Sequence, residues 1–111
     1  MIRSFTVPVY DSQVTLVRTQ AELQRVCDKH GVDEPEKHAD GICIQADWNT
    51  GRTQFILGWM TKDVSVLSHE CVHLAQFILI RAGIDPRDSN GETMAYLVGW
   101  IVDKCLKIKS L

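Results

Sequence analysis

The feature that most constrains the fold is a long apolar segment, Val64 to Ala82, in the second half of the chain. Asp63 before it is a suitable N-cap, and Gly83 followed by Pro86 supplies a stop signal, so we predict a helix between them. Because the segment is apolar on nearly every side, the helix is expected to lie in the middle of a fold and not on its surface. The rest of the chain must then provide the layers that cover it.

Strands supply one of these layers. Apolar and polar residues alternate in Ile42–Trp48 and again in Phe55–Trp59, around an Asn-Thr-Gly turn. This pattern predicts a β-hairpin that brings its two tryptophans onto one core-facing surface. Ile2–Val9 and Gln13–Arg18 are rich in Val, Thr and Phe and predict two further strands, the first being short or at an edge because of Pro8.

Two more helices complete the prediction. Thr19–Glu22 has the T-x-x-E form of a capping box and begins a helix that should end near Gly31. A last helix is expected from about Asn90 or Gly91 to Lys107. The order β-β-α-β-β-α-α predicts an α+β domain with a small, mostly antiparallel sheet packed against helices. A chain of 111 residues, 45% of them hydrophobic, fits one such domain spanning 1–111.

Composition narrows the classes of function. The net charge of −2 gives no basic character, so nucleic acid is not indicated as a partner. No apolar stretch reaches the ~18 residues that a membrane span needs, and the N-terminus lacks the apolar run of a signal peptide. The cysteines, which form no C-x-x-C pair, are expected to be free thiols. We therefore expect a soluble cytoplasmic protein with no membrane partner.

The motif that carries chemistry is His69-Glu70-Cys71-Val72-His73, within the predicted central helix. Histidines at i and i+4 lie on the same face one turn apart, so His69 and His73 can share one ion. Zn²⁺ favours imidazole nitrogen and, in catalytic sites, takes three protein ligands. Glu70 is placed to act as a general base beside the ion, whereas Cys71 projects to the other side of the helix.

The third ligand is left open between alternatives. Glu92 lies 19 positions beyond His73, and a helix–turn–helix return would bring it back toward the metal helix. However, Ser89-Asn90-Gly91-Glu92 also fits a capping box, which would turn the Glu92 carboxylate toward its own backbone. Asp85 and Asp88 are weaker competitors, better suited to a turn.

The stretch from Asp63 to Lys107 resembles the gluzincin class of zinc metallopeptidases, in which an HExxH helix precedes a glutamate on a later helix. The resemblance implies a zincin-like fold with His69, His73 and Glu92 as zinc ligands and Glu70 as the catalytic base. It also implies that an edge strand, here Arg52 to Trp59 or its partner, binds an extended peptide.

The chain departs from larger gluzincins in two ways: it has no C-terminal subdomain, and Tyr96 stands four residues after Glu92, where an aspartate often supports the histidine. The Glu-x-x-Ala-Tyr run is also similar to that of short phage-encoded metallopeptidases, which would place the protein in a host cytoplasm. Tyr96 shares a helix face with Glu92 and is a candidate donor to a developing oxyanion, or else a core tyrosine with a satisfied hydroxyl.

Three functions follow as hypotheses. The first is a zinc-dependent peptidase that hydrolyses a peptide or protein substrate with water activated at the ion and by Glu70. The second is a catalytically silent, zinc-stabilised binding or host-interaction protein with the same fold. The third is a metal-free interaction domain in which the His and Glu side chains are packed and paired.

Overall fold

The chain folds in the predicted element order, with one short 3₁₀ turn added. The computed structural model describes residues 3–33, 39–47 and 53–109. Its elements are β1 (Arg3–Val7), β2 (Ser12–Val17), α1 (Gln20–His30), β3 (Gly41–Asp47), β4 (Thr53–Trp59), α2 (Val64–Arg81), η1 (Asp88–Gly91) and α3 (Glu92–Ile108). The α+β class is therefore confirmed.

The four strands form one mixed sheet in the order β1-β2-β4-β3. β1 pairs with β2 and β3 pairs with β4 in antiparallel fashion, whereas β2 and β4 run parallel at the centre. The predicted antiparallel pairing is therefore found between β1 and β2 and between β3 and β4. It is not found between β2 and β4, because α1 separates the two hairpins in sequence and the second hairpin docks with β4 parallel to β2. As a result, β3 and β1 are the two edges of the described sheet.

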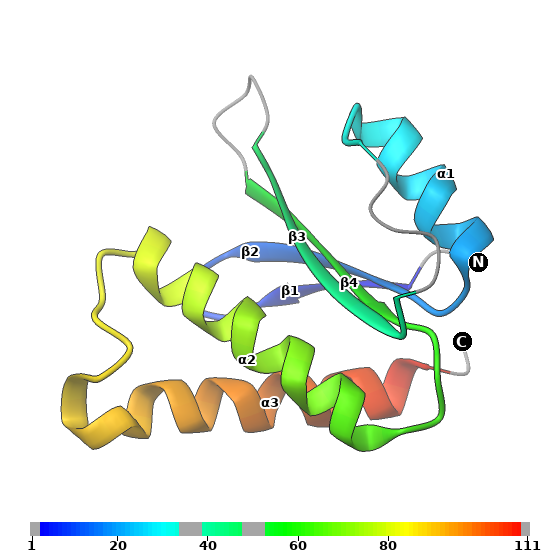
Figure 1. The fold of residues 1–111 in the computed structure, drawn as a ribbon. Coiled ribbons are helices and arrows are strands. Elements are labelled where there is room, and N and C mark those ends of the chain that lie inside the picture. The colour runs from blue at the N-terminus through cyan, green and yellow to red at the C-terminus, as the bar shows by residue number, and fades with distance from the viewer. Residues whose placement is uncertain (1–2, 34–38, 48–52, 110–111) are drawn as a thin grey trace.

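Helices cover the two faces of the sheet unequally. Figure 1 shows α2 and α3 side by side below the sheet and α1 alone above one end of it. α2 packs against β3 and β4, whereas α3 lies against β1, where the rings of Trp100 and Phe5 meet at a tilt of 56° with 5.9 Å between their centroids. α2 therefore covers the β3–β4 side of the sheet, and α3 lies nearer to β1.

The sheet has an apolar surface on both faces, and this corrects the predicted orientation of the hairpin. Phe55, Leu57 and Trp59 pack with α2 and α3. Ile42 and Ile44 pack with Ile56 and α1 on the opposite face, because the register pairs Ile44 with Ile56 and leaves the alternate residues to face the lower helices. Trp48, expected beside Trp59, lies outside the described residues.

Helix boundaries follow the predicted caps at some ends only. The Thr19 side chain accepts a hydrogen bond from Glu22 N at 3.1 Å, and Gly31 ends α1 in the left-handed region with φ 66°. The capping box predicted at Ser89 is wrong: the N-cap of α3 is Gly91, and no side chain caps it. Ser89 and Asn90 instead turn the chain with φ of 56° and 57°. The Glu92 carboxylate is therefore not committed to capping.

Helix α2 begins after Asp63 as predicted, but it is not covered all round. Leu67, Leu74 and Ile78 are buried on its inner side, while His69 and His73 are exposed. The prediction of a helix buried on every side is wrong because β3 is the last described strand of the sheet and leaves the outer side of α2 uncovered. Among the described helices, none has the length and apolar character that a transmembrane segment requires.

Candidate metal and catalytic site

The two histidines of the HExxH motif converge on the exposed side of α2. Their Nε2 atoms lie 3.2 Å apart, and the rings meet edge to face with 4.9 Å between centroids. The side chain of His69 is 68% exposed, so solvent ions have direct access. Convergence follows from the helix itself, since residues at i and i+4 stand one above the other.

The separation of the two nitrogens fits a shared zinc ion. With Zn–N bonds of about 2.0–2.1 Å, two nitrogens 3.2 Å apart subtend roughly 100–106° at the ion, close to the tetrahedral angle. A direct hydrogen bond between neutral rings also fits this distance, because one Nε2 can donate to the other. The donor set itself, two imidazoles, is the one that Zn²⁺ prefers.

Glu70 points from α2 toward β3 and is largely shielded from solvent. Its side chain is 12% exposed, and its Oε2 lies 3.9 Å from His69 Nε2. Gly41, the first residue of β3, permits this position: a Cβ there would lie 2.8 Å from Glu70 Cγ and 2.7 Å from Val66 Cγ1. The edge strand and the motif helix therefore touch at the glutamate.

An open cleft of about 300 Å³ runs between the start of β3 and α2, lined by Asp40, Gly41, Ser65, Val66, His69 and Glu70. Sequence reasoning identified the last two of these residues. It missed Gly41, whose only signal is its position directly before the alternating strand. The missing information was the docking of the predicted hairpin on α2, which brings position 41 against Val66 and Glu70.

Glu92 and Tyr96 are not brought to this cleft. Tyr96 is 77% exposed and lines a different cleft with Pro8 and Trp100, against β1 at the opposite edge of the sheet. Glu92, one helical turn before Tyr96, is also exposed. Within residues 3–33, 39–47 and 53–109, no group of three or more His, Cys, Asp or Glu side chains is arranged to hold a metal ion.

The length of α2 explains why Glu92 lies apart. α2 continues for about two turns beyond His73, to Arg81, before the chain turns back. The first turn of α3 therefore meets the far end of α2, and the inner side of α3 is apolar, with Leu97 and Ile101 buried. The structure unites His69, Glu70 and His73 and leaves the predicted roles of Glu92 and Tyr96 without support.

Two thiols in or near the motif, Cys71 and Cys43, have raised pKa values. Burial, together with the nearby Glu70 carboxylate, raises the pKa of Cys43 to about 12. A hydrogen bond with Cys105, together with burial, raises the pKa of Cys71 well above its usual range. Cys71 lies in the core, away from the histidines. Both thiols are therefore protonated near neutral pH in the metal-free protein.

Asp85 and Asp88 lie in the connection between α2 and α3, where they form part of the turn. Asp85 accepts two hydrogen bonds from the Arg87 side chain and one from its backbone N–H. These bonds lower the pKa of Asp85 to about 2. Asp88 begins η1. Both positions agree with the predicted turn.

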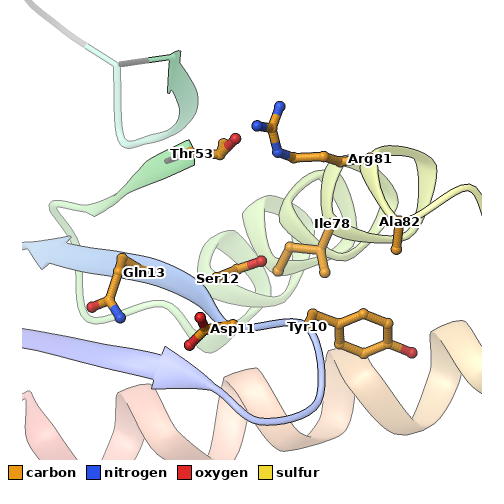
Figure 2. A pocket seen from close by; sticks show the side chains of 8 residues that line it. All are labelled: Tyr10, Asp11, Ser12, Gln13, Thr53, Ile78, Arg81 and Ala82. Atoms are coloured by element: carbon orange, nitrogen blue, oxygen red, sulfur yellow. The ribbon is translucent and has the colours of Figure 1, made fainter. Parts of the chain in front are cut away.

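A larger cleft, of about 480 Å³, lies at the far end of α2 and contains none of the motif residues. Figure 2 shows Arg81 extending toward Thr53 at the start of β4, and the Ser12 hydroxyl pointing toward Ile78. Polar side chains surround this cleft, but its lining includes no histidine or cysteine. It therefore offers no alternative zinc site.

The chain matches no protein family, no curated protein sequence and no solved structure. The function of the protein is therefore inferred from the geometry of His69, Glu70 and His73.

Proposed function

We propose that this protein is a zinc-dependent peptidase with a minimal zincin-like fold, in which His69 and His73 hold the ion and Glu70 is the general base. The observation that carries the proposal is the 3.2 Å separation of the two Nε2 atoms on the exposed face of α2. The ion, when bound, supplies Lewis acidity toward a carbonyl oxygen and lowers the pKa of water.

Glu70 is suited to accept a proton from the attacking water. Its carboxylate is mostly shielded, so fewer solvent molecules compete for it, and it faces the same cleft as His69. Gly41 lies against its side chain and restricts where the carboxylate lies. A base that is positioned in this way contributes about 10²–10⁴-fold to a proton-transfer step.

The edge of the sheet is suited to hold the substrate. β3 pairs with β4 on one side only, so along its described residues the other side presents unpaired backbone N–H and C=O groups. An extended peptide can add to such an edge as a further strand. Of the two strands that the resemblance offered for this role, β4 is interior and β3 is the edge, and β3 starts directly above Glu70.

A second candidate function is a zinc-stabilised binding protein without turnover. It is favoured by one observation: the described residues provide two metal ligands and not the three of a typical catalytic site. In that case zinc would raise the stability of the folded chain but no peptide would be cleaved.

The test combines zinc binding with peptide hydrolysis. We expect wild type to bind one equivalent of zinc and to cleave peptides from a mixed-sequence library. Glu70→Gln should keep zinc and lose about 10²–10⁴-fold in kcat. His69→Ala and His73→Ala should each lose zinc and activity together. Asp103→Asn, which changes an exposed carboxylate on α3, is the matched control and should behave like wild type.

The outcomes separate the two candidates. Zinc retained by wild type and by Glu70→Gln, with no cleavage by either, would reject the peptidase and support the zinc-stabilised protein. A wild-type protein that binds no zinc would reject both. Glu92→Gln adds a check on the third ligand: unchanged zinc affinity is expected from its position, whereas a large loss would restore its predicted role.

A further inference from the structure

A separate cleft, independent of the proposed hydrolytic site, lies between α1 and the sheet. Its volume is about 330 Å³, at the lower end of the roughly 300–1,000 Å³ typical of small-molecule sites. It is lined by Thr15, Leu16 and Val17 of β2 and by Glu22, Arg25, Val26 and Lys29 of α1. Figure 1 shows that α1 is the one labelled helix on this face of the sheet.

The polar groups in the walls of the cleft already have partners. The Thr15 hydroxyl is hydrogen-bonded to that of Ser4 at 3.2 Å. Glu22 Oε2 accepts a hydrogen bond from Arg3 Nη1 at 2.7 Å, and its Oε1 accepts one from the backbone N–H of Arg18. The floor is therefore apolar in character, and the negative charge of Glu22 is balanced by Arg3.

Two positively charged side chains stand at the rim of the cleft. Arg25 and Lys29 stand one helical turn apart and are both exposed. In the part of the chain that the structure describes, neither makes an ion pair. Their aliphatic stems extend the apolar surface while their charged ends stay in water. An apolar interior with two free cations at its mouth is complementary to a molecule with an alkyl body and one anionic end.

We propose that this cleft binds a medium-chain fatty acid, with the alkyl chain against Val17 and Val26 and the carboxylate between Arg25 and Lys29. Val17 and Val26 are apolar side chains in the lining of the cleft, and an alkyl chain would gain contact with them and with the aliphatic stems of Arg25 and Lys29. An extended peptide fits less well, because β2 is paired on both sides, with β1 and β4, and has no backbone groups to offer.

Decanoate, below its micelle-forming concentration, is a suitable probe, with decanol as the uncharged comparison. We expect decanoate to shift the methyl NMR signals of Val17 and Val26 in a saturable way. The double variant Arg25→Gln/Lys29→Gln removes both charges but keeps most of each aliphatic stem, so it should weaken decanoate binding by about tenfold or more and leave decanol binding nearly unchanged. Lys62→Gln, at an exposed lysine away from the cleft, is the matched charge control and should bind decanoate like wild type.

A Val26→Trp variant should fill the cleft and abolish binding of both probes. If this variant fails to fold, the double variant still tests the proposal, because it changes exposed side chains alone. Equal affinity for decanoate and decanol, or unchanged decanoate affinity in the double variant, would overturn the proposal. So would an acidic peptide that shifts these signals where decanoate does not.

Discussion

Replacing Gly41 by alanine should displace Glu70 without removing the metal ligands. A Cβ at position 41 would lie 2.7 Å from Val66 Cγ1, 2.8 Å from Glu70 Cγ and 3.1 Å from Glu70 Oε2. Real Cβ atoms essentially never show the two shorter distances. Because β3 is held by its hydrogen bonds to β4, we expect the side chains of α2 to move. The three atoms nearest to the added methyl group belong to Val66 and Glu70 and not to the histidines, so we expect the zinc site to persist.

The expected magnitudes follow from this overlap. Overpacking of this kind costs about 1–3 kcal/mol, and the smaller conformational freedom of alanine in the unfolded chain returns about 0.4–1 kcal/mol. The net loss is then about 0–2.6 kcal/mol, and its middle value of about 1.3 kcal/mol corresponds to a decrease in Tm of roughly 5–10 °C for a domain of this size. A catalytic group displaced by about 1 Å can lose about 10²-fold in rate.

The assay compares Gly41→Ala with Gly58→Ala. A Cβ at Gly58 would meet Ile42 Cγ2 at 2.7 Å, on the face of the sheet away from α2, so this variant carries a similar strain but leaves Glu70 alone. Thermal unfolding, zinc titration and peptide cleavage are measured for both. We expect similar losses of stability, unchanged zinc affinity in both, and a loss of cleavage in Gly41→Ala alone. Equal cleavage by the two variants would refute the placement of Glu70 against β3.

Three further predictions concern stability and protonation. Arg18→Ala should lower the free energy of unfolding by about 2–4 kcal/mol in urea titrations, because the guanidinium donates to two backbone carbonyls and lies 4.0 Å above the Trp59 ring. Cys43 has a pKa raised from 9.0 to about 12, so its contribution to stability is fully present below about pH 9 and lost as pH rises toward 12. Arg87→Ala should return the pKa of Asp85 from about 2 toward 3.8 in an NMR titration.

Each of these predictions has a matched comparison. Arg18→Lys keeps the charge but not the two-pronged donor, so it should recover part of the lost stability; full recovery would contradict the hydrogen-bond argument. For the thiol, Cys43→Ala should show a shallower loss of stability with alkali than wild type, and parallel curves would contradict the assignment. An Asp85 pKa that does not respond to Arg87→Ala would show that the turn backbone sets it.

Local signals in the sequence were sufficient for the elements but not for their docking. Thr19 and Gly31 mark the ends of α1 because capping depends on neighbouring residues alone. The parallel pairing of β2 with β4 joins residues about 40 positions apart and has no local signal. Nor did alternation alone reveal that Ile42 and Ile44 face α1, since both faces of this sheet are apolar.

The residues of the candidate site were also predictable only where their positions depend on local geometry. His69, Glu70 and His73 lie within five residues, so helical geometry alone predicted their convergence. The length of α2 was predicted correctly, but the position of Glu92 depends on how α3 packs beside α2 and against β1, for which the sequence has no local signal. Gly41 was missed because its importance arises from a contact across the fold.

Zinc X-ray absorption on the metal-loaded protein tests the central claim most directly, since it counts the nitrogen ligands and measures their distances. We predict one zinc per chain with two imidazole nitrogens at about 2.0–2.1 Å, and the loss of this signature in the His69→Ala/His73→Ala double variant. A spectrum with no imidazole scattering, or one that is unchanged in the double variant, would contradict a shared ion on α2.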